Sequence, residues 1–224
     1  PQREEIDMIL TVTARHLHRA PSRSDVLSAF AGVRPLAAAP GSARSSKISR
    51  EHAISVDSAG LVTVSGGKWT TYRRVAEQCV DVAVKLAGLR ARDVSTRELE
   101  LVTPDSARGG VDALGFPARG VAHIGAEQAA LAAPLSDALP YSGAHFAYAA
   151  RYEMAMTVAD ALAYHTRALF IDARAALDIA PRVATIMANE LQRDTNWVAS
   201  ELAALRSIAA PFILTPTPVR ETRG

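Results

Sequence analysis

Residues 63–84 read TVSGGKWTTYRRVAEQCVDVAV and change from a strand pattern to a helix pattern across two adjacent glycines. The apolar residues of 68–87 recur three or four positions apart, which places them on one side of a helix. They are Tyr72, Val75, Ala76, Cys79, Val80, Ala83, Val84 and Ala87. Gly88 follows as a usual C-terminal stop. The stretch therefore predicts a strand, a glycine turn and a long helix.

Further elements are predicted upstream. Residues 48–56, ISREHAISV, and 61–65, LVTVS, have strand patterns separated by turn residues, so they should form an antiparallel hairpin. Residues 3–18 repeat apolar side chains at helical spacing. Residues 26–36, VLSAFAGVRPL, predict a buried strand, with a short helix as the alternative, because the proline restricts the residue before it to extended geometry.

The second half changes to an alanine-rich helical pattern. Residues 103–120 contain six glycines and prolines and mark the best domain boundary, after an edge strand that 97–102 could add. Helices are predicted to start near Thr157, at Pro181 as a first helical residue, and after Asp194 as a cap.

These patterns predict an α+β fold class. Residues 1–103 would hold a helix, a few mostly antiparallel strands and the long helix; 104–120 would be a linker, and 121–224 an all-helical C-terminal domain. Because the chain begins with Pro1 directly in a helix pattern, we interpret the first part as the end of a larger domain.

Composition and charge exclude several classes. The 25 Lys and Arg are interleaved with 23 Asp and Glu, for a net charge of +2, which argues against nucleic-acid binding. The one cysteine, Cys79, excludes a disulfide framework and a cysteine-based metal site, and we expect it to be buried on the helix stripe. No apolar run approaches the roughly 18 residues that span a bilayer. A reducing, cytoplasmic compartment is expected.

A strand that runs through Gly66-Gly67 into a helix exposes backbone N–H groups at the positive end of that helix. Such a turn suits an anion or the edge of an electron-rich heterocycle. The triphosphate-binding pattern GxxxxGK[ST] fails, because Val62 and Trp69 occupy required positions, and GxGxxG does not occur in the chain. The alternative is a tight turn that binds nothing, with Thr70 and Thr71 capping the helix.

Several segments resemble the C-terminal part of FAD-dependent, aerobic-type glycerol-3-phosphate dehydrogenases. The likeness covers nearly the whole chain, in order, and the first three segments are specific to that family. The segments are AGVRPL (31–36), SKISREH (46–52), GLVTVSGGKWTTYRRVAE (60–77), RYEMAMTVADAL (151–162) and TRALFIDARAAL (166–177).

The resemblance implies FAD as the cofactor. Gly66, Gly67, Lys68, Trp69 and Thr70 match the turn that lies beneath the pyrimidine edge of the flavin in that family. A helix N-terminus and a lysine ammonium stabilise the negative charge that develops there on reduction, so Lys68 is also a catalytic candidate.

Two arginines match substrate-binding positions of the family. Arg34 resembles the residue that reaches the substrate beside the flavin, which makes it a catalytic and substrate-binding candidate, and Arg50 resembles a second basic residue of the pocket. A guanidinium offers a planar fork of donors to phosphate oxygens. Arg34 could instead pair with a carboxylate at a strand end, and for Arg50 a solvated position is an equal alternative.

The base that accepts the hydroxyl proton of the substrate cannot be placed. None of the six histidines has a carboxylate or a nucleophile at a telling spacing, so we expect structural or surface roles for all of them. The chain also departs from the family at Tyr164-His165-Thr166-Arg167, where a pair of arginines usually precedes the threonine.

The resemblance implies oxidation of sn-glycerol 3-phosphate to dihydroxyacetone phosphate, with electrons passed to a quinone or another acceptor, and no metal. Contact with the inner face of the plasma membrane and a homodimer are compatible with it. Because no dinucleotide pyrophosphate motif occurs here, we expect the isolated chain to be inactive. The rivals are a non-catalytic helical module that binds a partner protein and a relative of the flavin amine oxidases.

Overall fold

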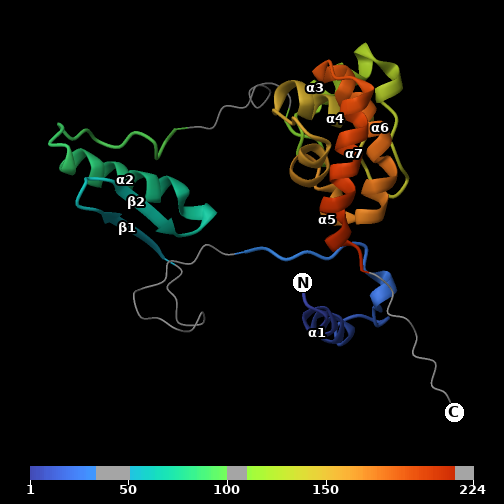
Figure 1. The fold of residues 1–224 in the computed structure, drawn as a ribbon, viewed down its shortest axis with the longest axis horizontal. Coiled ribbons are helices and arrows are strands. Elements are labelled where there is room, and N and C mark those ends of the chain that lie inside the picture. Colours follow the sequence, from blue (N-terminus) through green and yellow to red (C-terminus); the bar gives the residue numbers. More distant parts are fainter. Residues whose placement is uncertain (34–50, 100–109, 215–224) are drawn as a thin grey trace. The chain divides into compact units, whose positions relative to one another are not determined.

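The computed structural model describes residues 1–33, 51–99 and 110–214, and these form two compact units. One unit joins Pro1–Ala31 to Val102–Gly224, and the other spans Gly32–Leu101 (Figure 1). We call them the helical unit and the hairpin unit.

The hairpin unit begins with two antiparallel strands, β1 (His52–Val56) and β2 (Val62–Gly66). Their register pairs His52 with Gly66 at one end and Val56 with Val62 at the other. At the connecting turn, the Asp57 carboxylate accepts hydrogen bonds from the N–H groups of Ala59 and Leu61, both at 2.9 Å. The predicted hairpin is confirmed.

Helix α2 (Tyr72–Leu86) follows β2 through the glycine turn and a 3-10 turn, η3 (Trp69–Thr71). Ala87 is its C-cap residue, and Gly88 takes the left-handed conformation with φ +62°. The predicted helix and its glycine stop are therefore confirmed. The prediction that Cys79 is buried is wrong. Its side chain is half-buried, and no residue of α2 is fully buried.

The segment after α2 is held against the helix by polar contacts. Arg73 donates to the Thr96 hydroxyl at 3.2 Å, and Glu77 forms ion pairs with Arg73 at 2.8 Å and Arg97 at 3.3 Å. The edge strand predicted at 97–102 is absent from 97–99, which form a turn and a bend. The rest of that range lies outside the described residues.

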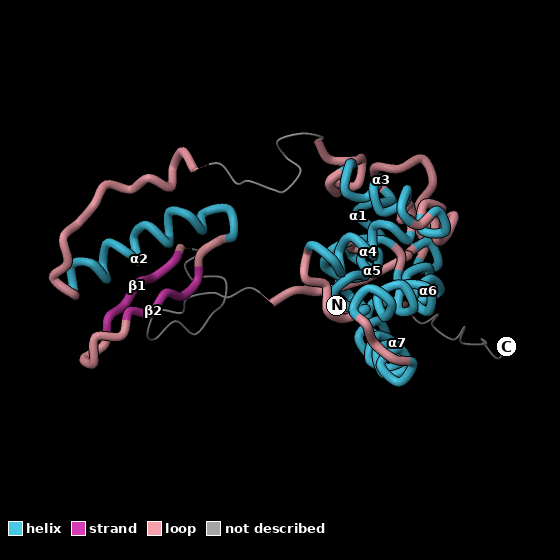
Figure 2. The backbone as a smooth tube through the Cα atoms, turned by 90° about the horizontal axis from the view of Figure 1, so that it is seen from above, coloured by secondary structure: helices cyan, strands magenta, loops and turns pink. Residues whose placement is uncertain are grey.

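The helical unit packs around α4 (Gly143–Tyr152) and α6 (Ala173–Leu191) (Figure 2). The inward faces of both helices are almost entirely buried. Many of these buried residues are alanines, which let the two helices approach closely. The surrounding elements are α3 (Ala118–Glu127), η4 (Ala129–Leu131), the π-helix Asp160–His165, α5 (Ala168–Ile171), α7 (Thr195–Ala209) and η6 (Ala210–Phe212). The predicted α+β class with a helical C-terminal part is confirmed.

Two of the three predicted helix starts are confirmed. The Asp194 carboxylate accepts from the Trp197 N–H at 2.8 Å, and Thr157 and Asp160 each accept, through the side chain, a hydrogen bond from the backbone N–H of the other, at 3.0 Å. The start at Pro181 is wrong. That helix begins eight residues earlier, at Ala173, because Asp172 caps it, and Pro181 lies inside it.

The N-terminal segment, Pro1–Ala31, is part of the helical unit. It contains α1 (Arg3–Ala14) and the 3-10 turn η1 (Arg23–Asp25). The strand predicted at 26–36 is absent from 26–33, and the remainder lies outside the described residues. Instead these residues have no regular secondary structure, with the Ala29 N–H donating to the Phe212 carbonyl at 2.9 Å and the Ala173 N–H donating to the Leu27 carbonyl at 3.2 Å. Residues 1–31 therefore belong to the helical unit, whereas we expected residues 1–103 to form one domain.

The described part of the predicted linker, residues 110–120, belongs to the helical unit. Val111 forms an isolated bridge with Pro117, Phe116 is buried in the core, and α3 begins at Ala118. The glycines and prolines of this stretch therefore form turns within the helical unit, and the described part of the predicted linker is not a linker.

Candidate flavin-binding turn

The turn between β2 and η3 requires both of its glycines. Gly66 has φ +73° and Gly67 φ +87°, a left-handed conformation that residues with a Cβ atom rarely adopt. A Cβ atom on Gly67 would also lie 3.1 Å from Cβ of His52. The turn therefore lies directly against β1, and its backbone is free of side chains at both positions.

The residues after the glycines build the start of the helix. Lys68 is extended, with φ −132° and ψ 148°, and its carbonyl accepts from both the N–H and the hydroxyl of Thr71 at 3.0 Å. Thr71 therefore occupies the N-cap position of α2, as the non-binding alternative assumed, but its hydroxyl donates to Lys68 and accepts no capping hydrogen bond from the helix. The positive end of the helix dipole lies at this turn.

A hollow of about 440 Å³ lies between the turn, β2 and the first turns of α2. Trp69 and Tyr72 form part of its wall: their rings stack at 5.2 Å with an interplanar angle of 23°, and Trp69 is 84% exposed. The lining of the hollow is mainly apolar and includes one lysine; the lining residues are Val64, Gly66, Gly67, Lys68, Trp69, Tyr72, Val75, Ala76 and Cys79. The arrangement can hold a planar aromatic group that carries negative charge at one edge.

Four of the five predicted cofactor residues, Gly66 to Trp69, thus line one hollow. Thr70 lies in η3 beside it but is not among the lining residues. Arg34 and Arg50, predicted to bind substrate, lie outside the described residues. Their assignment stays a prediction.

Four histidines have polar partners, although we expected none of the six to have a carboxylate at a telling spacing. Nε2 of His52 lies 2.5 Å from Oε1 of Gln78, and His165 pairs with Glu153 at 3.1 Å. His123 pairs with Glu127, also at 3.1 Å, four positions along α3. The fourth, His145, is buried.

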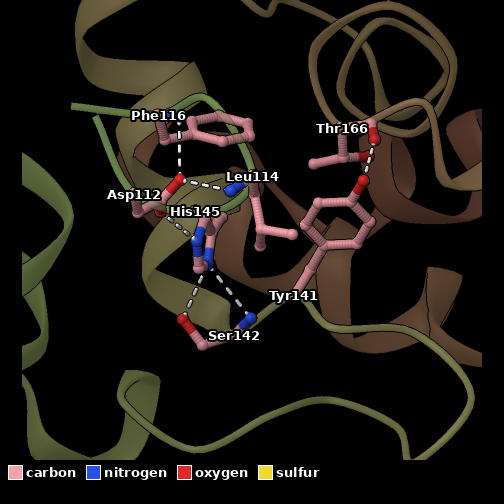
Figure 3. A network of polar contacts seen from close by, with 7 residues as sticks. All are labelled: Asp112, Leu114, Phe116, Tyr141, Ser142, His145 and Thr166. Atoms are coloured by element: carbon pink, nitrogen blue, oxygen red, sulfur yellow. Dashed lines mark hydrogen bonds and ion pairs between the residues drawn. The ribbon is translucent and has the colours of Figure 1, made fainter. Parts of the chain in front are cut away.

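The His145 network lies in the helical unit (Figure 3). His145 Nδ1 accepts from the Ser142 N–H at 3.1 Å and lies 2.9 Å from the Ser142 hydroxyl, and Nε2 lies 3.1 Å from the Asp112 carboxylate. Nε2 therefore carries the hydrogen, because Nδ1 is an acceptor. The other Asp112 oxygen accepts from the N–H groups of Leu114 and Phe116 at 2.8 and 2.9 Å.

This serine, histidine and aspartate arrangement is structural. Ser142 and His145 are 8% and 7% exposed, so a substrate cannot reach the hydroxyl, and the serine caps α4. Beside it the Tyr141 hydroxyl donates to the Thr166 carbonyl (Figure 3). The capping-box spacing of Ser142 and His145 was visible in the sequence. Asp112, however, is 33 positions away from His145, and no local pattern could have linked these two residues.

The segment that departs from the expected family pattern lies in the same unit. Tyr164 and His165 end the π-helix, with Tyr164 74% exposed. Thr166 is buried and donates to the Ala161 carbonyl at 2.8 Å, and Arg167 takes a left-handed conformation with φ +59°.

Within 1–33, 51–99 and 110–214, no cluster of three or more acidic, histidine or cysteine side chains is arranged to hold a metal ion. Over the same residues, no helix combines the length and apolar character needed to cross a membrane.

Comparison with known families places more than half of the chain in one family. A family model described as the C-terminal domain of alpha-glycerophosphate oxidase matches residues 61–197, from β2 to the start of α7. The chain belongs to this family. The resemblance that we inferred from the sequence segments is thereby confirmed.

Several relatives of this chain are named glycerol-3-phosphate dehydrogenases. The mitochondrial enzyme of Arabidopsis thaliana is 32% identical, over 95% of this chain and 39% of the relative. The human mitochondrial enzyme is 32% identical over 88% and 30%, and glycerol-3-phosphate dehydrogenase 1 of Mycobacterium bovis 36% identical over 75% and 35%. The chain thus spans about a third of the length of these relatives.

Proposed function

We propose that this chain is the C-terminal portion of an FAD-dependent glycerol-3-phosphate dehydrogenase, which oxidises sn-glycerol 3-phosphate to dihydroxyacetone phosphate. The observation that carries the proposal is the Gly66-Gly67-Lys68 turn, which precedes α2 and lines one hollow together with the stacked rings of Trp69 and Tyr72. The relatives' names supply the substrate.

The residues present fit a flavin. Two glycines without side chains let a planar ring approach the backbone, Val64 and Val75 give the hollow an apolar wall, and Lys68 is the cation among the lining residues. When bound, FAD would accept the hydride from the substrate carbon. The turn and Lys68 would stabilise the negative charge that this transfer leaves on the pyrimidine edge.

The substrate is a phosphate dianion and needs cationic partners. We propose Arg34 and Arg50 for this role, because guanidinium groups form paired hydrogen bonds with phosphate oxygens and stay charged at working pH. We leave the base that takes the hydroxyl proton unassigned. The electron acceptor would be a quinone or another acceptor at the cytoplasmic face of a membrane, and a homodimer is compatible with this role.

The test uses the full-length protein that contains this chain. The purified protein should show a flavin absorbance spectrum that bleaches when glycerol 3-phosphate is added without oxygen. Arg34→Ala and Arg50→Ala should raise KM for the substrate, and Lys68→Met should slow flavin reduction by roughly tenfold to a hundredfold.

Arg90→Ala and Lys85→Met are matched controls at exposed positions of the hairpin unit and should leave both quantities unchanged. A full-length protein without flavin, or a flavin that glycerol 3-phosphate does not reduce, would refute the proposal.

A further inference from the structure

His52 lies behind the glycine turn, on the strand next to it. It is the first residue of β1 and pairs with Gly66 in the hairpin register. Its Cβ atom is the nearest neighbour of the position that a Cβ on Gly67 would take, at 3.1 Å. The turn therefore rests on His52, and any shift of this residue would be transmitted to the backbone of the turn.

Gln78 fixes the ring of His52 from the other side. It lies on the second turn of α2, and its Oε1 atom is 2.5 Å from Nε2 of His52. Because an amide oxygen only accepts, Nε2 carries a hydrogen and donates it. On the same helix, Cγ2 of Val75 lies 3.9 Å from the Cβ position of Gly67. One hydrogen bond thus ties β1 to α2 directly behind the turn.

Neither His52 nor Gln78 is among the residues that line the hollow, so they would not touch a ligand there. A hydrogen bond fixes both the distance and the direction between two groups, whereas an apolar pair of similar size fills the same space with less directional constraint. An apolar pair would therefore keep the hairpin on the helix but would not hold the turn at one distance from α2.

We propose that His52 is a positioning residue that, through its hydrogen bond to Gln78, sets the place of the Gly66-Gly67-Lys68 turn against the flavin. The inference rests on the proposed function. The exposed N–H groups of the turn and the Lys68 ammonium stabilise charge only if they are held in place, since electrostatic stabilisation depends on preorganised donors. His52 and Gln78 supply that constraint.

The test compares variants of the full-length, FAD-loaded protein. His52→Leu and Gln78→Leu remove the hydrogen bond, and Gln78→Glu retains an acceptor oxygen. Either leucine variant should weaken FAD binding about fivefold, which corresponds to one hydrogen bond. Both should lower kcat and make the flavin reduction potential more negative, with KM for glycerol 3-phosphate changed less than about twofold.

Two further comparisons separate positioning from general stability. The double variant should bind FAD no more weakly than either single variant, because both remove the same interaction. Gln78→Glu should keep FAD affinity and kcat near the wild-type values. Lys85→Leu, at an exposed position near the end of α2, is the control and should change neither.

Leucine variants with unchanged FAD affinity, potential and kcat, in a wild-type protein that binds flavin and oxidises the substrate, would overturn the positioning role alone. If Gln78→Glu loses as much stability as the leucine variants do, His52 and Gln78 have a structural role instead. A wild-type protein without flavin would overturn the proposed function and this inference with it. If His52→Leu does not fold, Gln78→Leu still decides the question.

Discussion

At the scale of single residues, the Asp112 carboxylate links the charge of one side chain to the stability of the helical unit. Burial raises its pKa, but hydrogen bonds from the N–H groups of Phe116 and Leu114 and from His145 outweigh this, so the pKa of Asp112 is lowered overall. Since the folded pKa lies below the unfolded value of about 3.9, the ionised form favours folding. The contribution is complete above that unfolded value and is lost as the pH falls through the folded one.

We therefore expect Asp112→Asn to destabilise the protein by about 1–2 kcal/mol at pH 7 and by less as the pH approaches about 3. The asparagine cannot accept from His145 and from both backbone N–H groups with the strength of a carboxylate. Urea unfolding of wild type and variant at a series of pH values measures the difference. Asp137→Asn, at an exposed position, is the control, and an equal pH dependence in Asp112→Asn and wild type would contradict the prediction.

At the scale of elements, Arg151 of α4 ties α3 and α6 together. It forms a bidentate ion pair with Glu190 of α6, in which Nη2 lies 2.9 Å from Oε1. It forms a second ion pair with Glu127 of α3 at 2.8 Å. The Glu190 side chain is 10% exposed, and these two carboxylates, Glu190 first, raise the pKa of Arg151. The pair therefore fixes how three helices meet at one edge of the core.

Arg151→Ala should lower the free energy of unfolding by about 2–4 kcal/mol, because it leaves the buried Glu190 carboxylate without its partner. Arg151→Lys should cost less, since the charge remains but the paired geometry is lost. The double change Arg151→Met with Glu190→Leu should recover much of the loss. Chemical denaturation compares these variants with Arg193→Ala, an exposed control, and an equal effect of both alanine variants would refute the assignment.

The elements also show what local sequence can predict. The hairpin, the glycine turn and α2 were predicted because their signals lie within a few residues of one another. The Pro181 error arose because Asp172 was not recognised as the cap. Residues 26–33, predicted as a strand, are instead an irregular segment stabilised by hydrogen bonds with Leu169, Ala173 and Phe212. Contacts made over such sequence separations, including the link from His145 to Asp112, leave no periodic pattern.

At the scale of the whole molecule, the two compact units are not consecutive in the chain. The segment through Ala31 belongs with the helices, and Phe30 is its aromatic contact: its ring lies 4.7 Å from that of Phe170 and 6.3 Å from that of Phe212. The Ser28 hydroxyl also donates to the Leu169 carbonyl at 2.9 Å. The N-terminal segment should therefore contribute to the stability of the helical unit.

We expect Phe30→Ala to lower the free energy of unfolding of the helical unit by about 1–2 kcal/mol, the loss of partly buried aromatic contacts. Trp197, which packs against the core of this unit, reports its unfolding in urea once the other tryptophan is removed by Trp69→Phe. Val33→Ala is the matched control, because Val33 is 99% exposed and lies in the stretch assigned to the hairpin unit. If Phe30→Ala unfolds at the same urea concentration as Val33→Ala, the contacts of the Phe30 ring do not stabilise the helical unit, and the prediction is wrong.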